Sequence, residues 1–369
     1  MSLSLTVWNW QMPEWPDFGY DEHRIRPLEV EFLHRSGVHV GSFLHLNPQD
    51  QELLRTELLS DEALQTSKIE GELLDRDSVQ SSIRRLFGLS GDGRKSSPAE
   101  QGISELQVDV YRNFAGVLTD EKLFEWHRMV VRGRWDLKEI GQYRQHQEPM
   151  VIVSGAIHDP VIHYEAPPSR QVAGEMKRFI EWFNRPLTGP LGGLARAGIA
   201  HLWFESIHPF EDGNGRIGRA IAEMALSQAL SQPTLVALSI VLEKHRKQYY
   251  EELGLASRTM ELTGWLDFFG SMVLEAQEQS LRKIGFLVKK TQFFERYRGL
   301  LNERQEKVLS RMFREGEDGF KGGLSSKNHI RITGCSPATA TRDLAALVEL
   351  GAMVRTGELK NARYFLNLK

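Results

Sequence analysis

The chain has 369 residues, of which 41% are hydrophobic and 26% charged, and its formal net charge is −3 at pH 7. This length suffices for two or three domains with separate cores, and the average composition predicts an ordered soluble protein. The single cysteine, Cys335, excludes intramolecular disulfides; with no apolar run of about 18 residues and no signal peptide, we expect a cytoplasmic protein without a membrane span.

The first fifty residues are rich in aromatic side chains that alternate with prolines. Three of the eight tryptophans, Trp8, Trp10 and Trp15, lie here. We interpret this segment as an arm that wraps a helical core, and a peptide-binding surface is the alternative use of the same side chains.

A helix is predicted over residues 61–74, because Ser60 is a good N-cap and Asp61 and Glu62 make its first turn acidic. Within it, Thr66 to Gly71 reads TSKIEG. Taken alone, Glu70 would be a solvated side chain on a polar face.

Further on, residues 150–164 contain two β-branched runs around turn residues and predict a β-hairpin.

The most informative segment is His208–Arg219, HPFEDGNGRIGR, which joins two predicted helices. Residues 192–207 favour a largely buried helix, and a second helix is predicted from Asn214 to residue 230. Gly213 and Gly215 therefore lie where the second helix exposes unpaired backbone N–H groups. Such groups are natural partners of phosphate oxygens.

The side chains of this segment complete an anion site. Arg216 and Arg219 lie three residues apart on the second helix, and each can make forked contacts with phosphate oxygens. Asp212 offers a hard oxygen ligand for Mg2+, and His208 can accept a proton from a hydroxyl group near neutral pH. The alternative, a tight structural turn beside a core histidine, has no need of these charged groups, so the combination indicates a nucleotide.

The segment resembles the signature H-x-F-x-[DE]-G-N-G-R-x-x-R of the Fic family. The matching residues are His208, Phe210, Asp212, Gly213, Asn214, Gly215, Arg216 and Arg219. The resemblance implies a mainly α-helical bundle with a β-hairpin flap. It also implies a protein adenylyltransferase that transfers AMP from ATP to a Ser, Thr or Tyr hydroxyl of a target protein, with the chain itself as one candidate target. His208 would then be the base, Asp212 the Mg2+ ligand, and Arg216 and Arg219 the ligands of the inner and γ-phosphates.

The same resemblance gives roles to two other segments. TSKIEG matches the inhibitory motif [ST]-x-x-x-E-[GN] at Thr66, Glu70 and Gly71, which implies that Glu70 forms a salt bridge to Arg219 and removes the γ-phosphate clamp. The pair Tyr249-Tyr250 matches tyrosines that border the nucleoside in the family.

The end of the chain differs in charge from the rest. Residues 291–369 hold 14 Lys and Arg against 9 Asp and Glu, a net charge of +5, which leaves −8 for residues 1–290. We predict helices over 302–314, around 325–330 and over 337–350, then strands over 353–356 and 363–368. This order resembles a winged helix-turn-helix, with DNA or a docking protein as its partner. The side chains expected to face DNA are Thr339, Thr341, Arg342, Lys360 and Arg363.

We therefore divide the chain into an N-terminal arm with the inhibitory helix (1–100), a Fic catalytic domain (101–290) and a winged helix-turn-helix domain (291–369). Exposed helical faces and the habit of the family favour a homodimer. Two rival functions stay open. One is an enzyme that moves another phosphate-containing group or removes AMP, with Glu70 helping to activate water. The other is a DNA-bound regulator whose core senses ATP.

Overall fold

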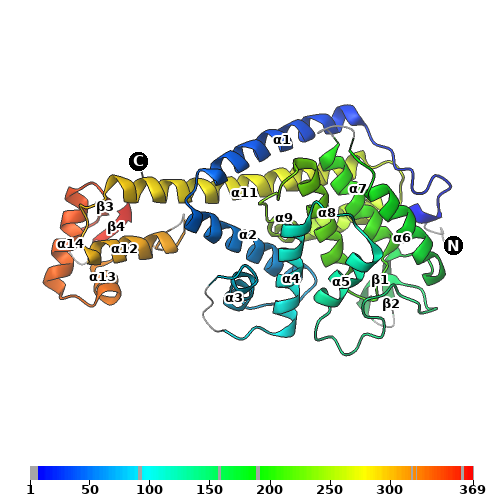
Figure 1. The fold of residues 1–369 in the computed structure, drawn as a ribbon, viewed down its shortest axis with the longest axis horizontal. Helices are drawn as coiled ribbons and strands as arrows, with labels where there is room; N and C mark the ends of the chain where they lie inside the picture. Colours follow the sequence, from blue (N-terminus) through cyan, green and yellow to red (C-terminus); the bar gives the residue numbers. More distant parts are fainter. Residues whose placement is uncertain are drawn as a thin grey trace. The chain divides into compact units, whose positions relative to one another are not determined.

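The computed structural model describes residues 7–89, 94–156, 159–187, 192–316, 319–320, 322–358 and 361–368. Helices dominate the described part of the chain, and the strands form two antiparallel hairpins (Figure 1). The chain divides into two compact units, one of Met1–Gly41 with Glu52–Ser280 and one of Ser42–Gln51 with Leu281–Lys369. The predicted mainly α-helical fold class is confirmed.

The first unit is a helical bundle whose elements follow the chain in order. They are η1 (Asn9–Gln11), α1 (Glu22–Leu44), α2 (Pro48–Ile69), α3 (Arg76–Leu86), α4 (Pro98–Asn113), α5 (Asp120–Val130), α6 (Ser169–Phe183), α7 (Gly193–Ile207), α8 (Asn214–Leu230), α9 (Leu238–Lys244), α10 (Arg246–Ala256) and α11 (Thr263–Arg296). The boundary between the units lies within α1, α2 and α11.

Helices α7 and α8 form the centre of this bundle and pack against each other (Figure 1). Most residues of α7 are buried, on every side of the helix, as its apolar sequence requires. Phe204 and Ile207 of α7 and Ile217 and Ile221 of α8 have no exposed surface. The glycine-rich segment is the connection between these two helices, so its position is fixed from both ends.

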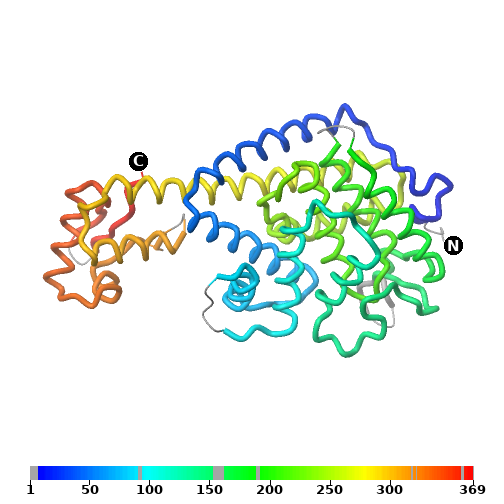
Figure 2. Tube along the Cα trace, viewed as in Figure 1, coloured from blue at the N-terminus to red at the C-terminus, as the bar shows by residue number. Residues whose placement is uncertain are grey.

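The two long helices α1 and α11 run alongside each other in the first unit (Figure 2). Side chains of α1 bond to backbone carbonyls of α11: Nη1 of Arg35 donates to Leu274 at 2.9 Å, and Nε2 of His39 lies 2.7 Å from the oxygen of Gln277. Glu29 of α1 reaches α7 instead. Its carboxylate accepts bonds from the backbone N–H groups of Leu194 and Ala195 at 3.1 and 2.7 Å and so caps that helix.

The aromatic side chains of the arm pack on the bundle. The ring of Trp15 lies 6.0 Å from that of Trp203, and Trp8 lies 5.1 Å from Tyr164, both centroid to centroid and edge to face. Nε1 of Trp15 donates to Glu175 on α6. The arm thereby covers the outer surface of α6 and α7.

The predicted bounds of the helix over residues 61–74 are wrong at both ends. Helix α2 already begins at Pro48 and continues through Ser60 to Ile69. The Ser60 hydroxyl donates to the carbonyl of Thr56, one turn earlier, at 2.6 Å, and so does not cap a helix. Buried side chains before Ser60, including Leu54 and Leu58, continue the helix in the N-terminal direction.

The predicted hairpin is confirmed. Strands β1 (Val151–Ala156) and β2 (Asp159–Glu165) pair antiparallel, with Ile152 opposite Tyr164 and an irregular register between Ile152 and Val153. Tyr164 is buried and donates to the carbonyl of Ser206 on α7 at 2.6 Å. This bond ties the hairpin to the last turn of the helix that precedes His208.

The second unit holds α12 (Glu303–Arg314), α13 (Ser326–Thr333) and α14 (Pro337–Glu349), followed by β3 (Met353–Thr356) and β4 (Arg363–Leu366). Asn302 caps α12 and Ser336 caps α14. Val308, Leu309, Leu344 and Leu347 form its fully buried core. Of the side chains expected to face DNA, Thr341 and Arg342 are exposed, Thr339 and Arg363 are partly buried, and Lys360 lies outside the described residues.

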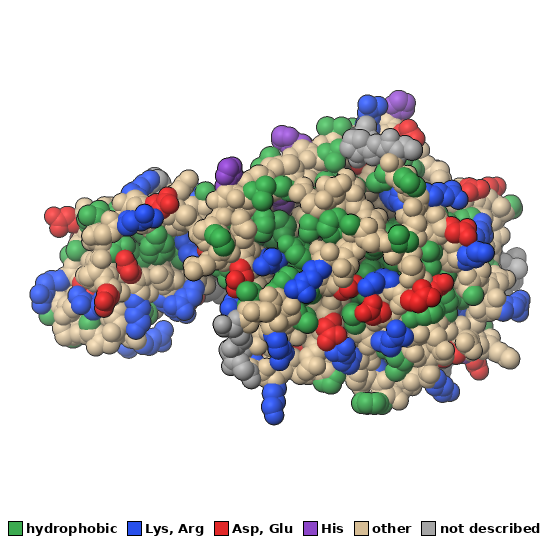
Figure 3. Space-filling view, viewed as in Figure 1, with side chains coloured by type: hydrophobic (Ala, Val, Ile, Leu, Met, Phe, Trp, Pro, Cys, Tyr) green, Lys and Arg blue, Asp and Glu red, His purple; other side chains and the backbone are tan. Residues whose placement is uncertain are grey.

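In the described part of the chain, no helix has the length and apolar character needed to cross a lipid bilayer. On the face of the first unit seen in Figure 3, side chains of both charges are intermixed. Broad single-sign charge is therefore not what marks a functional site on this face.

The cap on α7 generates a stability prediction. We expect Glu29→Ala to lower the free energy of unfolding by about 1–3 kcal/mol, because two buried N–H groups lose their acceptor. Thermal and urea unfolding of the full chain would measure it. Glu31→Ala is the matched control on the same helix: that side chain is partly exposed and pairs with Arg35, so the expected loss is about 0.5 kcal/mol or less. Equal losses in the two variants would contradict the capping role.

Candidate functional site

The site begins where α7 ends. His208 adopts the left-handed conformation, with φ 50° and ψ 59°, which costs a residue with a Cβ about 1 kcal/mol. The fully buried Arg144 holds this turn: its Nε donates to the carbonyl of His208 at 2.8 Å, and its guanidinium also bonds to Pro167 and Ile207. Burial lowers the pKa of Arg144 to about 10, so it keeps its charge at pH 7.

A second set of bonds closes the loop after His208. The side chain of Asn214 accepts from the N–H of Phe210 at 2.9 Å and donates to its carbonyl at 2.8 Å. Phe210 is fully buried and stacks on His127 with ring centroids 4.2 Å apart. Gly213 has φ 82°, and a Cβ there would lie 2.9 Å from a methyl group of Val130. The loop is therefore a rigid connection.

The imidazole of His208 is largely buried, with 13% of the side chain exposed. Its Nδ1 is 3.3 Å from the carbonyl oxygen of Glu205 and 3.7 Å from the Glu205 carboxyl. Burial lowers the pKa of His208 to about 4, and the positive charge of Arg144 adds to this effect. The ring is therefore neutral at pH 7 and able to accept a proton.

A carboxylate already lies beside the first turn of α8. A Cβ at Gly215 would collide with Oε1 of Glu70 and would stand 3.1 Å from Nη1 of Arg219. Gly215 thus leaves room for an anion at a helix N-terminus, which is where backbone N–H groups and the helix dipole favour negative charge.

Arg219 has the strongest contacts with the TSKIEG segment. Its Nη2 donates to Oε1 of Glu70 at 2.7 Å, and its Nε donates to the hydroxyl of Thr66 at 2.7 Å. The side chain of Arg219 is 2% exposed and that of Glu70 is 30% exposed. Burial is the largest single effect and lowers the pKa of Arg219, but the charge and hydrogen bond of Glu70, together with Tyr249 and Glu205, outweigh it and raise this pKa above its usual range.

The other two charged residues of the motif are also paired. Nη1 of Arg216 lies 2.8 Å from the carboxylate of Glu72, two residues after Glu70. Asp212 contacts the guanidinium of Arg134 and lies 3.6 Å from Arg216. The Asp212 side chain is 34% exposed at the edge of the site, so its oxygens fit the ligand set of Mg2+, provided that Arg134 moves.

The tyrosine pair on α10 divides into one buried and one open ring. Tyr249 is buried, and its hydroxyl lies 2.7 Å from Nε2 of His201. Tyr250 is 44% exposed, with its hydroxyl 3.5 Å from the carbonyl of Ile69, next to Glu70. The open ring of Tyr250 is thus the one that a nucleoside could contact.

The structure brings the sequence-predicted residues together around the N-terminus of α8 and adds four that the sequence reasoning missed. These are Glu72, Arg134, Arg144 and Glu205. Three of them lie in loops or at a helix end, without periodicity that would single them out. Glu205 is the exception, because it is an acid within a helix whose residues are mostly apolar and buried.

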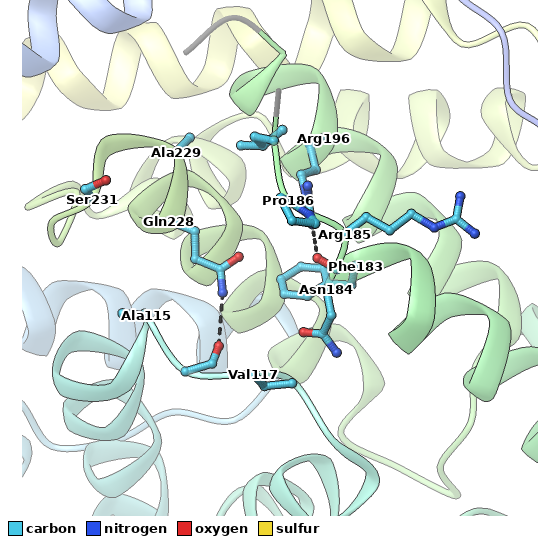
Figure 4. A pocket seen from close by; sticks show the side chains of 12 residues that line it. Ala115, Val117, Phe183, Asn184, Arg185, Pro186, Arg196, Gln228, Ala229 and Ser231 are labelled. Atoms are coloured by element: carbon cyan, nitrogen blue, oxygen red, sulfur yellow. Dashed lines mark hydrogen bonds between the residues drawn. The ribbon is translucent and has the colours of Figure 1, made fainter. Parts of the chain in front are cut away.

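A cavity of about 500 Å3 lies away from these residues (Figure 4). It is lined by Phe183, Arg196, Gln228 and neighbouring residues, at the C-terminal end of α8. Because α8 has 17 residues, its two ends are about 25 Å apart. The cavity is therefore separate from the site at the N-terminal end.

Comparisons with known proteins match the chain in two segments. Residues 117–226 match the Fic/DOC family, and residues 8–89 match a domain of unknown function, DUF4172. Proteins named protein adenylyltransferase Fic from Drosophila willistoni and Drosophila melanogaster are each 33% identical over 140 residues, which is 38% of this chain and 25% of theirs. The chain thus aligns with about a quarter of the length of these curated relatives.

Two solved structures share the fold. A Fic family protein from Desulfovibrio desulfuricans G20 has a TM-score of 0.53 and 21% identity, with 92% of this chain and 96% of that chain covered. A segment of Fic-1 from C. elegans has a TM-score of 0.51 and 22% identity, with coverages of 72% and 74%. Residues 117–226 thus match the Fic/DOC family in agreement with the motif, and the fold of the chain is that of solved Fic proteins.

Proposed function

We propose that this protein is an adenylyltransferase that transfers AMP from ATP to a hydroxyl side chain of a target protein, and that Glu70 inhibits it. The observation that carries the proposal is the carboxylate of Glu70 held between the first turn of α8 and Arg219. An anion is bound there by the groups that would bind a phosphate. The names of the relatives, protein adenylyltransferase Fic, support the same reaction.

The phosphates of ATP would bind at the N-terminus of α8. Gly213 and Gly215 allow the backbone to approach the phosphate chain closely, and Arg216 and Arg219 supply the positive charge. The exposed ring of Tyr250 would contact the nucleoside. Asp212 would hold Mg2+, which supplies charge neutralisation to the phosphates when it is bound.

In the transfer step, the target hydroxyl oxygen forms a bond to the α-phosphorus and the bond from that phosphorus to pyrophosphate breaks. The neutral imidazole of His208 accepts the hydroxyl proton, and pyrophosphate leaves with the electron pair. Arg144 and Asn214 hold the loop so that the imidazole does not have to be ordered during the reaction. The β1–β2 hairpin would align the target segment as an added strand.

Inhibition follows from competition for one arginine. Arg219 cannot bind the γ-phosphate while both Thr66 and Glu70 hold its guanidinium. Glu72 holds Arg216 in the same way through a more exposed pair, so the inhibitory segment occupies both phosphate-binding arginines. ATP then lacks its clamp and is not aligned for attack.

The second unit would serve as a docking module. The order of α12, α13, α14 and the β3–β4 hairpin supports the winged helix-turn-helix interpretation, and Thr341 and Arg342 are exposed on the helix that would meet a partner. DNA and a docking protein are both compatible with these residues.

The pair of Glu70 and Arg219 generates a prediction for label transfer. We expect Glu70→Gly to raise label transfer from α-labelled ATP by roughly a hundredfold, because about 3 kcal/mol of ion pairing no longer opposes ATP binding. Autoradiography and mass spectrometry of the chain after incubation with Mg2+ and either α- or γ-labelled ATP would measure this.

The double variant Glu70→Gly/His208→Ala is the control. It should lose label transfer but still bind ATP. Label from γ-labelled ATP would indicate transfer of another group. Loss of activity in Glu70→Gly, with AMP released by the parent protein, would indicate removal of AMP. ATP binding without transfer in every variant would favour an ATP sensor.

A further prediction concerns the Mg2+ dependence of transfer. In the Glu70→Gly background, Arg134→Ala should lower the Mg2+ concentration for half-maximal transfer about twofold to fivefold, because a partly exposed ion pair no longer competes for Asp212. Asp212→Asn should raise that concentration at least about tenfold. Titration of transfer with Mg2+ measures both.

Arg132→Ala is the matched control, since Arg132 is two residues away and pairs with Glu105 instead. It should leave the Mg2+ dependence unchanged. An unaltered dependence in Asp212→Asn would exclude Asp212 as the ligand.

A further inference from the structure

Glu205 is an acidic side chain inside the anion site that the proposed reaction does not yet use. It lies on the last turn of α7, three residues before His208, and its side chain is 13% exposed. One carboxyl oxygen, Oε2, is 3.7 Å from Nδ1 of His208. The other, Oε1, is buried without a hydrogen-bond partner. An acid in this position needs an explanation, because a buried carboxylate without partners is costly.

The neighbouring helix leaves space for this carboxyl group. A Cβ at Gly218 would stand 2.6 Å from Oε1 of Glu205 and 3.1 Å from Nδ1 of His201. Any other residue at 218 would push the acid out of its position. The carboxyl group therefore lies between the imidazole of the base on one side and the first turns of α8, with Arg219, on the other.

We propose that Glu205 is a positioning residue that joins the base to the anion site: it orients the imidazole of His208 and binds a proton when an anion occupies the site. The role rests on the proposed transfer reaction. With the carbonyl and carboxyl of Glu205 both on the Nδ1 side of the ring, Nε2 is left to face the target hydroxyl. A neutral carboxyl group can do this next to a triphosphate, whereas a carboxylate would repel it.

The charges around Glu205 agree with a neutral acid. Burial raises the pKa of Glu205, the carboxylate of Glu70 adds to this effect and Arg219 opposes both, which leaves the pKa at about 8. At pH 7 the proton is therefore on Glu205 and not on His208, whose pKa is about 4. When Glu70 is replaced by phosphates, negative charge remains beside Glu205 and the proton stays bound.

The other titratable groups facing Glu205 do not change charge between pH 7 and 9. Burial lowers the pKa of His201 to about 3, so this imidazole stays neutral. Burial raises the pKa of Tyr250 to about 12 and also raises the pKa values of Tyr164 and Tyr249, so these phenols keep their protons. Arg219 stays charged. The phosphates of ATP, with a second pKa near 6, are already ionised there. A pH effect on ATP binding in this interval thus reports on Glu205.

The test compares Glu70→Gly with Glu70→Gly/Glu205→Gln, because glutamine keeps the shape of the neutral acid but cannot ionise. The experiment measures two quantities from pH 6.5 to 9: the Kd for labelled ATP, by equilibrium dialysis, and the kcat of label transfer. In Glu70→Gly the Kd should rise about fivefold to tenfold between pH 7 and 9, since ATP binding requires protonation of Glu205. In the glutamine variant it should change less than about twofold, and kcat at pH 7 should stay within about threefold.

Two further variants separate this role from a structural one. Glu70→Gly/Glu205→Ala should lose at least about tenfold in kcat at pH 7, because His208 loses its partner on the Nδ1 side. Glu70→Gly/Glu29→Gln alters a buried acid at the opposite end of α7, whose pKa burial also raises, and should keep the pH dependence of Glu70→Gly.

Superimposable Kd curves for Glu70→Gly and its Glu205→Gln derivative would overturn the proposal, even if transfer proceeds normally. A pH-dependent Kd that only Glu205→Gln abolishes would support the link to the anion site even if no variant transfers label, in which case the transferase assignment alone fails. Matching melting temperatures of the glutamine variant and its parent establish that both are folded.

Discussion

The buried positive charge of Arg219 is the constraint on which the rest of the site depends. Its side chain is almost fully enclosed, so an anion must accompany it. Thr66 of α2 and Glu70, in the turn directly after α2, satisfy that need, and Gly215 leaves the space that the Glu70 carboxylate occupies. A helix far away in the sequence is thereby fixed against α8. In our proposal, the inhibited and active states differ in which anion neutralises Arg219.

His208, the proposed base, is held by a different set of contacts, which do not involve the TSKIEG segment. Arg144 fixes the strained turn at His208 through backbone carbonyls, and Asn214 closes the loop onto Phe210. Because these bonds do not involve Glu70, we expect the loop to keep its geometry when another anion replaces the Glu70 carboxylate. In our proposal, inhibition therefore acts on the phosphate-binding arginines and leaves the group that accepts the proton in place.

Much of this arrangement could be predicted from the sequence. The ends of α7 and α8 follow from apolar periodicity interrupted by Pro209, Gly213 and Gly215, and those of α14 from a capping serine followed by proline. The predicted start of α2 was wrong because a serine in mid-helix, followed by acidic residues, has the same local pattern as an N-cap. Arg134 and Arg144 escaped prediction because loop residues find their partners only through the tertiary fold.

Glu205 lies between the contacts that hold His208 and those that surround Arg219. It shares the last turn of α7 with His208, and its carboxyl lies against Gly218 on the helix that carries both arginines. A permanent negative charge there would pair with Arg219 and compete with any phosphate, so the position requires a carboxyl group that is neutral whenever an anion is present. Burial without a hydrogen-bond partner on Oε1 has that effect. The feature that makes this acid costly for folding thus also makes it compatible with an anion-binding site.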